Sequence, residues 1–245
     1  MPNVEVRGLT KVYGSGDTGV TALDHVDLTV EPGEFVAVMG PSGCGKSTLL
    51  NLVGGLDKPT SGQVLIADTD IATMTDRSVT ELRRRRLGFV FQFFNLIPVL
   101  TTAENAALPL TLDGVKPAEA NDRARDWLRK VGLGDKLESR PDQLSGGQQQ
   151  RVAVARALVT DPALVLADEP TGNLDSKSAD EIANLLKQAA EEWGRAIVMV
   201  THDVTIASHA HRIVFMRDGA VVDDVALGAD PAADARQAME RAGLL

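Results

Sequence analysis

A glycine-rich loop between a predicted buried strand and a predicted helix constrains the fold of this chain more than any other feature. The loop reads Gly-Pro-Ser-Gly-Cys-Gly-Lys-Ser over residues 40–47. The apolar run Phe35–Met39 before it is typical of a buried parallel strand. Lys46–Val53 after it is typical of a helix, which ends at Gly54-Gly55. A strand that passes through such a loop directly into a helix predicts an α/β fold.

The same loop predicts a nucleotide site. Its spacing, G-x-x-x-x-G-K-[ST], is that of the phosphate-binding loop. Successive N–H groups and a helix N-terminus together favour an anion. We expect Lys46 to reach the β- and γ-phosphates, and the Ser47 hydroxyl to ligate Mg²⁺. The expected nucleotide-binding residues of the loop are Gly40, Pro41, Ser42, Gly43, Cys44, Gly45, Lys46, Ser47 and Thr48.

Two acidic residues follow a second apolar strand. Leu164–Ala167 is continuously apolar, and Asp168-Glu169 comes directly after it. Asp168 fits the Mg²⁺ contact of phosphate-loop enzymes, and Glu169 fits the base that activates or orients water. Thr201-His202 ends a further buried strand, Ile197–Thr201. A histidine in that position is by itself commonly a packed or exposed side chain.

The overall composition excludes several classes of function. The chain has 245 residues, a net charge of −9 and 4% aromatic residues. It therefore has neither the basic face of a nucleic-acid binder nor a stacking platform for single strands. Cys44 is the single cysteine, which excludes an intramolecular disulfide. We expect bound nucleotide to protect its thiol from a maleimide; the alternative is a buried, inert thiol. With no predicted signal peptide or membrane span, we expect a cytosolic protein whose membrane contact comes through a partner.

A second motif, Leu-Ser-Gly-Gly-Gln at residues 144–148, lies about a hundred positions after the phosphate loop and opens a predicted helix, Gln148–Val159. Together the two motifs resemble those of the ATP-binding cassette (ABC) family, over about Val4 to Val225. The resemblance implies an ATPase that uses ATP and Mg²⁺. It also implies a phosphate-loop α/β fold with a mainly parallel core sheet, an N-terminal antiparallel β-subdomain and a helical insertion.

The resemblance assigns roles to further residues. Tyr13 matches the aromatic residue that stacks on adenine. Gln92, at the end of the predicted strand Leu87–Phe91, matches a residue that ligates Mg²⁺ and the attacking water and senses a partner. His202 matches the residue that contacts the γ-phosphate and holds the Glu169 water. The resemblance also implies a homodimer with two ATP molecules sandwiched between the copies. The residues expected to bind ATP across that interface are Ser145, Gly146, Gly147, Gln148 and Asp175.

Strand and helix patterns predict how the chain is organised. Residues 1–230 read as one ABC ATPase domain, and the helical insertion covers about 93–160. Residues 231–245 read as a C-terminal tail that forms a short surface helix. A hairpin is expected around Arg217-Asp218-Gly219. Ser178-x-x-Glu181 is expected to be the capping box that opens a helix.

Three longer stretches resemble the macrolide-export and lipoprotein-release branch (MacB, LolD), with FtsE nearby. They are residues 54–62, 91–98 and 167–175. The branch implies a membrane permease partner with few spans and a large extracytoplasmic domain, with the chain held peripherally at the cytoplasmic face. Such a complex exports or extracts a lipoprotein, peptide or drug. The alternative is an FtsE-like regulatory ATPase that signals to a cell-wall enzyme without transport.

The apolar segment after Gln92 predicts where a permease docks. In the family this joint receives a cytoplasmic helix of the permease, and apolar anchors suit a helix held in a groove. The expected docking residues are Phe93, Phe94, Leu96 and Ile97. The basic run Arg83–Arg86 reads as a solvated helix end, or alternatively as a contact with anionic lipid or an acidic partner loop.

Overall fold

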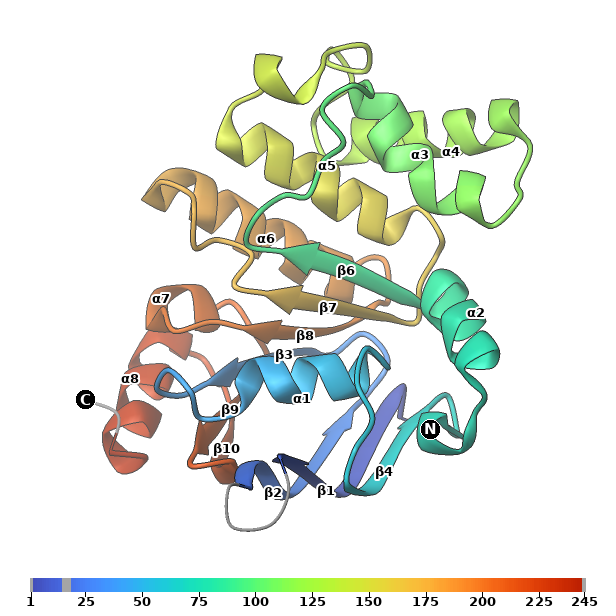
Figure 1. The fold of residues 1–245 in the computed structure, drawn as a ribbon. Coiled ribbons are helices and arrows are strands. Elements are labelled where there is room, and N and C mark those ends of the chain that lie inside the picture. The colour runs from blue at the N-terminus through green and yellow to red at the C-terminus, as the bar shows by residue number, and fades with distance from the viewer. Residues whose placement is uncertain (1, 15–18, 244–245) are drawn as a thin grey trace.

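The computed structural model describes residues 2–14 and 19–243. Its centre is a sheet with the strand order β10-β9-β3-β8-β7-β6, in which only the edge strand β10 is antiparallel to its neighbour (Figure 1). This confirms the mainly parallel core sheet and the hairpin that joins β9 to β10. The strands are β3 (Phe35–Met39), β6 (Leu87–Phe91), β7 (Leu164–Asp168), β8 (Ala196–Val200), β9 (Arg212–Arg217) and β10 (Ala220–Ala226).

A second, antiparallel sheet has the order β2-β1-β4-β5 and confirms the predicted N-terminal β-subdomain. Its strands are β1 (Val4–Tyr13), β2 (Val20–Val30), β4 (Ser61–Ile66) and β5 (Thr69–Asp70). Helix α1 (Lys46–Val53) packs with both sheets in one buried apolar cluster. The phosphate loop at its N-terminus is therefore held by both sheets.

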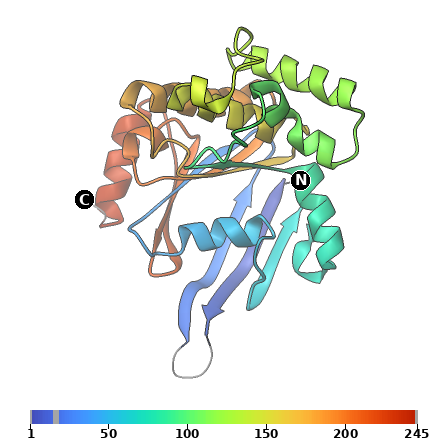
Figure 2. The same cartoon turned by 45° about the horizontal axis from the view of Figure 1, so that its top comes forward.

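The predicted insertion is a group of three helices on the opposite side of the central sheet from the antiparallel sheet (Figure 2). It contains α3 (Thr102–Leu112), α4 (Pro117–Lys130), a 3₁₀ turn at Pro141–Gln143 and α5 (Gly146–Leu158). These helices share a small apolar core of their own. Helix α2 (Asp76–Arg86), preceded by a 3₁₀ turn at Ile71–Thr73, connects the antiparallel sheet to β6.

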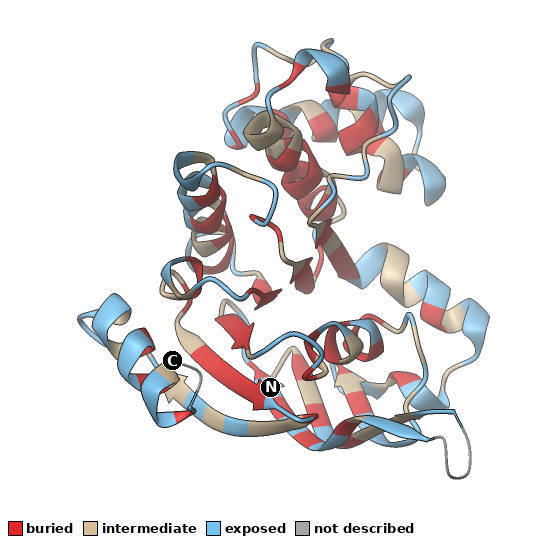
Figure 3. Ribbon diagram, turned by 60° about the vertical axis from the view of Figure 1, so that its left-hand side comes forward, coloured by how far each residue is buried: buried red, intermediate tan, exposed pale blue. Residues whose placement is uncertain are grey.

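Helices α6 (Ser176–Glu191), α7 (Val204–Ala207) and α8 (Pro231–Arg241) complete the cover of the central sheet, whose inner strands are largely buried while the edge strand β10 is not (Figure 3). The prediction that Ser178 caps α6 was wrong. The cap is Asp175, whose carboxylate accepts the Ser178 N–H, so the helix begins at Ser176. Helix α8 packs through the fully buried Ala235 and Ala238. Residues 244–245 of the predicted tail lie outside the described residues.

One aromatic contact joins the helical insertion to the rest of the molecule. The rings of Trp127, on α4, and Trp193, in the turn after α6, meet edge to face with their centroids 4.9 Å apart. Within the part of the chain that the structure describes, no helix has the length and apolarity needed to cross a membrane.

Candidate functional site

The phosphate loop begins and ends on glycines that its surroundings require. A Cβ on Gly40 would lie 2.1 Å from the Met216 carbonyl oxygen, and a Cβ on Gly45 would lie 2.4 Å from that of Ala22. Gly45 has a φ of 104° and caps α1 without a side-chain hydrogen bond. The first N–H groups of α1 are therefore left for an anion. Lys46 Nζ donates to the Gly40 and Pro41 carbonyl oxygens at 2.7 and 2.8 Å, within the loop itself.

Cys44 is buried under the loop, with its Sγ 3.7 Å from Lys46 Nζ. Its side chain belongs to the apolar cluster beneath α1 and is 4% exposed. Its N–H donates to the Pro41 carbonyl oxygen at 3.3 Å. The thiol is thus buried rather than accessible in this structure, and its protection by bound nucleotide stays a prediction. The Cys44 side chain is buried because it packs in the apolar cluster under the loop. The loop motif alone does not indicate this packing.

Asp168 lies at the end of β7 beside the phosphate loop. The Ser47 hydroxyl donates to its Oδ1 at 3.4 Å. Burial raises the pKa of Asp168, and the neighbouring Glu169 adds to this, while Ser47 and Lys46 act in the opposite direction. A desolvated carboxylate beside a hydroxyl is a set of hard oxygen donors that suits Mg²⁺. Among the described residues, no group of three or more His, Cys, Asp or Glu side chains is placed to hold a metal ion. Mg²⁺ in nucleotide sites commonly takes further ligands from substrate phosphates.

Glu169 and His202 meet at the ends of the adjacent parallel strands β7 and β8. His202 Nδ1 lies 3.0 Å from both carboxylate oxygens of Glu169. The Glu169 side chain is 21% exposed and that of His202 is 74% exposed. Glu169 has a φ of 46°. Two backbone hydrogen bonds hold this conformation: the Glu169 N–H donates to the Val200 carbonyl oxygen, and the Glu169 carbonyl oxygen accepts the Gly172 N–H. A cavity of about 360 Å³ opens beside the pair, so the pair is accessible to water.

Gln92 directly follows β6. In the sheet, β7 lies between β6 and β8. Its Nε2 donates to Asn173 Oδ1 at 3.3 Å, and Asn173 Nδ2 donates back to the Gln92 carbonyl oxygen at 3.1 Å. Gly172 leaves room for this pair, because a Cβ there would lie 2.9 Å from Gln92 Nε2. The partner Asn173 was not among the predicted site residues. It joins Gln92 to the loop that leads to Asp175.

The second motif caps its own helix. The Ser145 hydroxyl accepts the Gln148 N–H, and Gln148 Oε1 accepts the Ser145 N–H, so the two form a capping box at the N-terminus of α5. No hydrogen bond between described residues joins 145–148 to the phosphate loop. Asp175 caps α6, where its hydrogen bonds from Ser178 lower its pKa. The structure thus does not bring these residues together with the phosphate loop of the same chain.

Tyr13 stands at the end of β1 with 42% of its surface exposed. Its hydroxyl donates to Asp57 Oδ2 at 3.0 Å, and Lys11 Nζ lies 4.8 Å from the ring centroid. Lys11 also pairs with Asp57 at 2.8 Å, and its hydrogen bond lowers the Asp57 pKa. The sequence prediction missed this support. Asp57 lies 44 residues after Tyr13 in the chain, so no local sequence pattern indicates that Asp57 supports Lys11 and Tyr13.

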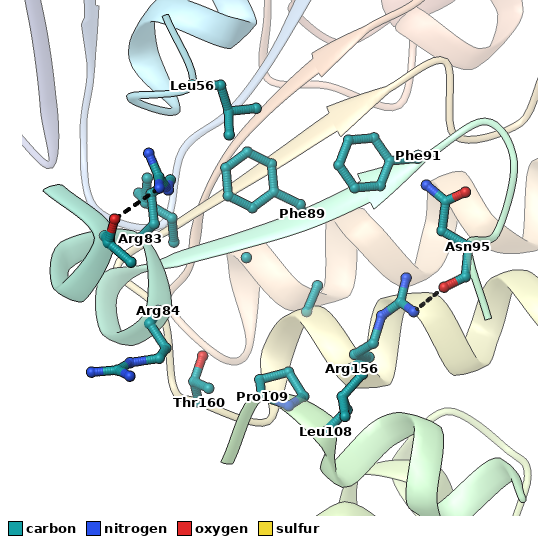
Figure 4. Close-up of a pocket in the computed structure, with 14 residues that line it drawn as sticks. Leu56, Arg83, Arg84, Phe89, Phe91, Asn95, Leu108, Pro109, Arg156 and Thr160 are labelled. Carbon is teal, nitrogen blue, oxygen red and sulfur yellow. Dashed lines mark hydrogen bonds between the residues drawn. The ribbon is translucent and has the colours of Figure 1, made fainter. Parts of the chain in front are cut away.

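A groove of about 490 Å³ lies near the predicted docking segment, but of residues 93–97 only Asn95 lines it (Figure 4). Phe93 and Ile97 are 69% and 37% exposed, whereas Phe94 and Leu96 are half-buried. The groove itself is lined by Phe89, Phe91, Pro109 and neighbouring apolar side chains, with Arg83 and Arg84 at one end. Arg156 donates to the carbonyl oxygens of Phe94 and Asn95 and so fixes this segment to α5.

The basic run does not act as a free cationic patch. Arg83 donates to the Gly55 carbonyl oxygen at 2.5 Å, and Arg84 and Arg85 both pair with Asp113 at the end of α3. Arg85 and Arg86 are exposed, whereas Arg83 and Arg84 are half-buried. Three of the four guanidinium groups therefore hold α2 against its neighbours.

Comparisons with known proteins agree with this geometry. The family described as "ABC transporter" matches residues 23–172. The macrolide export ATP-binding/permease protein MacB of Hyphomonas neptunium is 47% identical over 91% of this chain, which spans 34% of that protein. The lipoprotein-releasing system ATP-binding protein LolD of Alcanivorax borkumensis is 48% identical over 89% of this chain and 96% of its own length.

A solved structure shares the fold over nearly the whole chain. It is the dimeric, post-hydrolysis state of the ATP-binding cassette MJ0796 bound to ADP and Pi, a protein of Methanocaldococcus jannaschii. The TM-score is 0.83 at 45% identity, over 92% of this chain and 99% of the other. This chain therefore belongs to the ABC transporter family, as an ATP-binding cassette of the MacB and LolD type.

Proposed function

We propose that the chain hydrolyses ATP to ADP and phosphate and thereby drives a membrane permease. The observation that carries the proposal is that Asp168, Glu169 and His202 stand at the ends of two adjacent strands, with Asp168 hydrogen-bonded to Ser47 of the phosphate loop. In this scheme Lys46 leaves the loop carbonyls to contact the phosphates. Glu169 accepts the proton of the attacking water, and His202 orients the Glu169 carboxylate. Gln92 lies beside the same water.

Ser47, Asp168 and Gln92 are the residues proposed to hold Mg²⁺. When bound, the ion would neutralise charge on the β- and γ-phosphates. Asp168 is suited to this because burial has already raised its pKa, so a nearby cation relieves an unfavourable ionised state. Tyr13, held by Asp57, is proposed to stack on the adenine.

The second half of the site is proposed to come from another copy. The N-terminus of α5 favours an anion but lies apart from its own phosphate loop. Ser145, Gly146, Gly147, Gln148 and Asp175 are therefore proposed to complete the site of a second copy, and two ATP molecules to bridge a two-fold homodimer. Support comes from the dimeric cassette structure at 45% identity.

The variant Glu169→Gln tests this mechanism. It should bind Mg-ATP, hydrolyse it at least about 100-fold more slowly because the base is lost, and accumulate as an ATP-dependent dimer. Size-exclusion chromatography with and without ATP measures the dimer, and phosphate release measures turnover. The control, Lys46→Ala, should fail at nucleotide binding. A Glu169→Gln protein that stays monomeric at saturating ATP, or keeps most of its turnover, contradicts the assignment.

The groove of Figure 4 is proposed to receive an amphipathic cytoplasmic helix of the permease, which would place the chain at the cytoplasmic membrane face. The predicted docking segment contributes only Asn95 to the groove lining. Within that segment, the more exposed Phe93 and Ile97 are the better anchors for a helix that also extends over this loop. Phe93→Glu should spare ATP binding and basal hydrolysis but abolish co-purification with the permease. Val222→Glu, at a 41% exposed position on β10, is the control. Unchanged complex formation by Phe93→Glu refutes this docking site.

A further inference from the structure

One buried amide connects two strand ends of the proposed catalytic site. Gln150 lies on α5, and its side chain is fully buried. Its Nε2 donates to the Phe91 carbonyl oxygen at 3.1 Å and to the Pro170 carbonyl oxygen at 2.5 Å. Phe91 directly precedes Gln92, and Pro170 directly follows Glu169. A single NH₂ group therefore holds the backbone next to both residues.

The chemistry of the two neighbours fixes the orientation of this amide. Both are carbonyl oxygens, which accept hydrogen bonds, so only the NH₂ end of Gln150 can face them. Its Oε1 has no hydrogen-bond partner among the described residues. A buried oxygen without a partner destabilises a fold, and an apolar side chain would avoid that cost. What the two donated bonds supply, and an apolar side chain cannot, is one donor shared by the Phe91 and Pro170 carbonyl oxygens.

The position of these bonds shows what they supply. Strands β6 and β7 pair in parallel up to Phe91 and Asp168, the last pair of their ladder. Beyond this pair the strand ladder does not set the separation of Gln92 and Glu169, and the Gln92–Asn173 hydrogen bonds described above hold only the Gln92 side chain and carbonyl to the loop that follows Glu169. The Gln150 amide bridges the two strand ends at that point, from the same helix that begins at Ser145.

We propose that Gln150 is a positioning residue for hydrolysis, which sets the separation of Gln92 and Glu169 without touching the nucleotide. The inference rests on the proposed function, because it assumes that both residues act on the same water. An enzyme that needs two groups around one water is sensitive to displacements of about 1 Å, which can lower its rate on the order of 10²-fold. Loss of the bridge should therefore lower kcat rather than ATP affinity.

Three variants test the proposal in the full-length chain. Gln150→Leu keeps size and helix propensity but removes both bonds, and should lower kcat by roughly 10–100-fold with the KM for ATP within about threefold. Gln150→Glu can donate only when protonated, so its kcat relative to wild type should fall as the pH rises, whereas that of Gln150→Leu should not. The control for packing is Val154→Ala, an equally buried residue of α5 without polar atoms in its side chain.

A double-mutant cycle separates positioning from general destabilisation. If Gln150 acts through Gln92, the combination of Gln150→Leu with Gln92→Ala should lose little more activity than Gln92→Ala alone. Independent, multiplicative losses would overturn the proposal. So would a kcat loss no greater than that of Val154→Ala at a matched drop in Tm. Failure of wild-type ATP hydrolysis, or of the Glu169→Gln dimer, would instead count against the proposed function.

Discussion

At the scale of single residues, two adjacent carboxylates have different surroundings. Burial raises the pKa of Asp168. Glu169, one residue later, turns out of the strand at a positive φ and meets His202 near the surface. Because Glu169 leaves the strand at a left-handed φ directly after Asp168, the two neighbouring carboxylates are separated. One becomes suited to a cation and the other to water.

The raised pKa of Asp168 predicts that this carboxylate lowers the stability of the nucleotide-free fold at neutral pH, although hydrolysis needs it. Because the folded pKa lies above the unfolded value of about 3.9, stability falls as the pH rises from there through the folded pKa, and the loss is complete above it. Asp168→Asn should therefore raise the Tm of the nucleotide-free protein at neutral pH by roughly 1–3 °C, and abolish hydrolysis.

Scanning calorimetry at pH 7 and near pH 4 checks this. The stabilisation should shrink at the lower pH, because the raised pKa keeps a larger fraction of the wild-type Asp168 carboxyl protonated there. Asp122→Asn, at an exposed position on α4, is the control for a general loss of negative charge. An Asp168→Asn protein that is less stable than wild type at neutral pH contradicts the assignment of burial as the cause.

At the scale of elements, α5 organises the segment that follows β6. Its N-terminus carries the capping box, and its C-terminal half holds the Phe94 and Asn95 carbonyl oxygens through the Arg156 guanidinium at 2.8 and 2.6 Å. Burial lowers the pKa of Arg156, as expected for a guanidinium that has exchanged water for carbonyl oxygens. Arg156 thus connects the proposed docking segment, residues 93–97, to α5 by hydrogen bonds. The N-terminus of the same helix is proposed to contact the ATP bound by a second copy.

Replacing this guanidinium should loosen the segment. Arg156→Lys keeps the charge but cannot donate to two carbonyls in a fork, so it should lower the free energy of unfolding by roughly 1–3 kcal/mol. Hydrogen exchange of the amides at residues 94–97 should also speed up. Urea unfolding and exchange mass spectrometry measure the two effects. The matched control is Arg123→Lys, because Arg123 donates a single bond, to the Val159 carbonyl oxygen; equal effects of the two variants would contradict the fork.

At the scale of the whole molecule, the sequence predicts elements that carry a strong apolar pattern and misses those that do not. Strands β3 and β7 are continuous apolar runs, and their existence follows from composition alone. Strand β4 begins with three exposed residues and shows no periodicity that local analysis detects. Helix α2 buries only Val79, so the sequence indicates only its basic end, Arg83–Arg86. The order of strands in the sheet is likewise set by tertiary packing.

The candidate site shows the same division. Motif spacing placed Lys46, Asp168 and Glu169 on particular elements, but the contact of Glu169 with His202 depends on β7 and β8 being neighbours 33 residues apart in the chain. Gln150 lies in a run of four polar residues near the start of α5, at residues 148–151, and a pattern analysis has no reason to single it out. Its role depends on two carbonyls, 59 and 20 residues away, and no local signal contains them.

The contact between Trp127 and Trp193 has a practical consequence, because these are the only two tryptophans in the sequence. One belongs to the helical insertion and the other to the turn that leads into the central sheet. Their indoles, 4.9 Å apart and inclined at 79°, are close enough to couple optically. Any rotation of the insertion against the sheet alters that coupling. The protein thus carries an intrinsic, label-free chromophore pair whose emission and near-ultraviolet dichroism report that motion in real time.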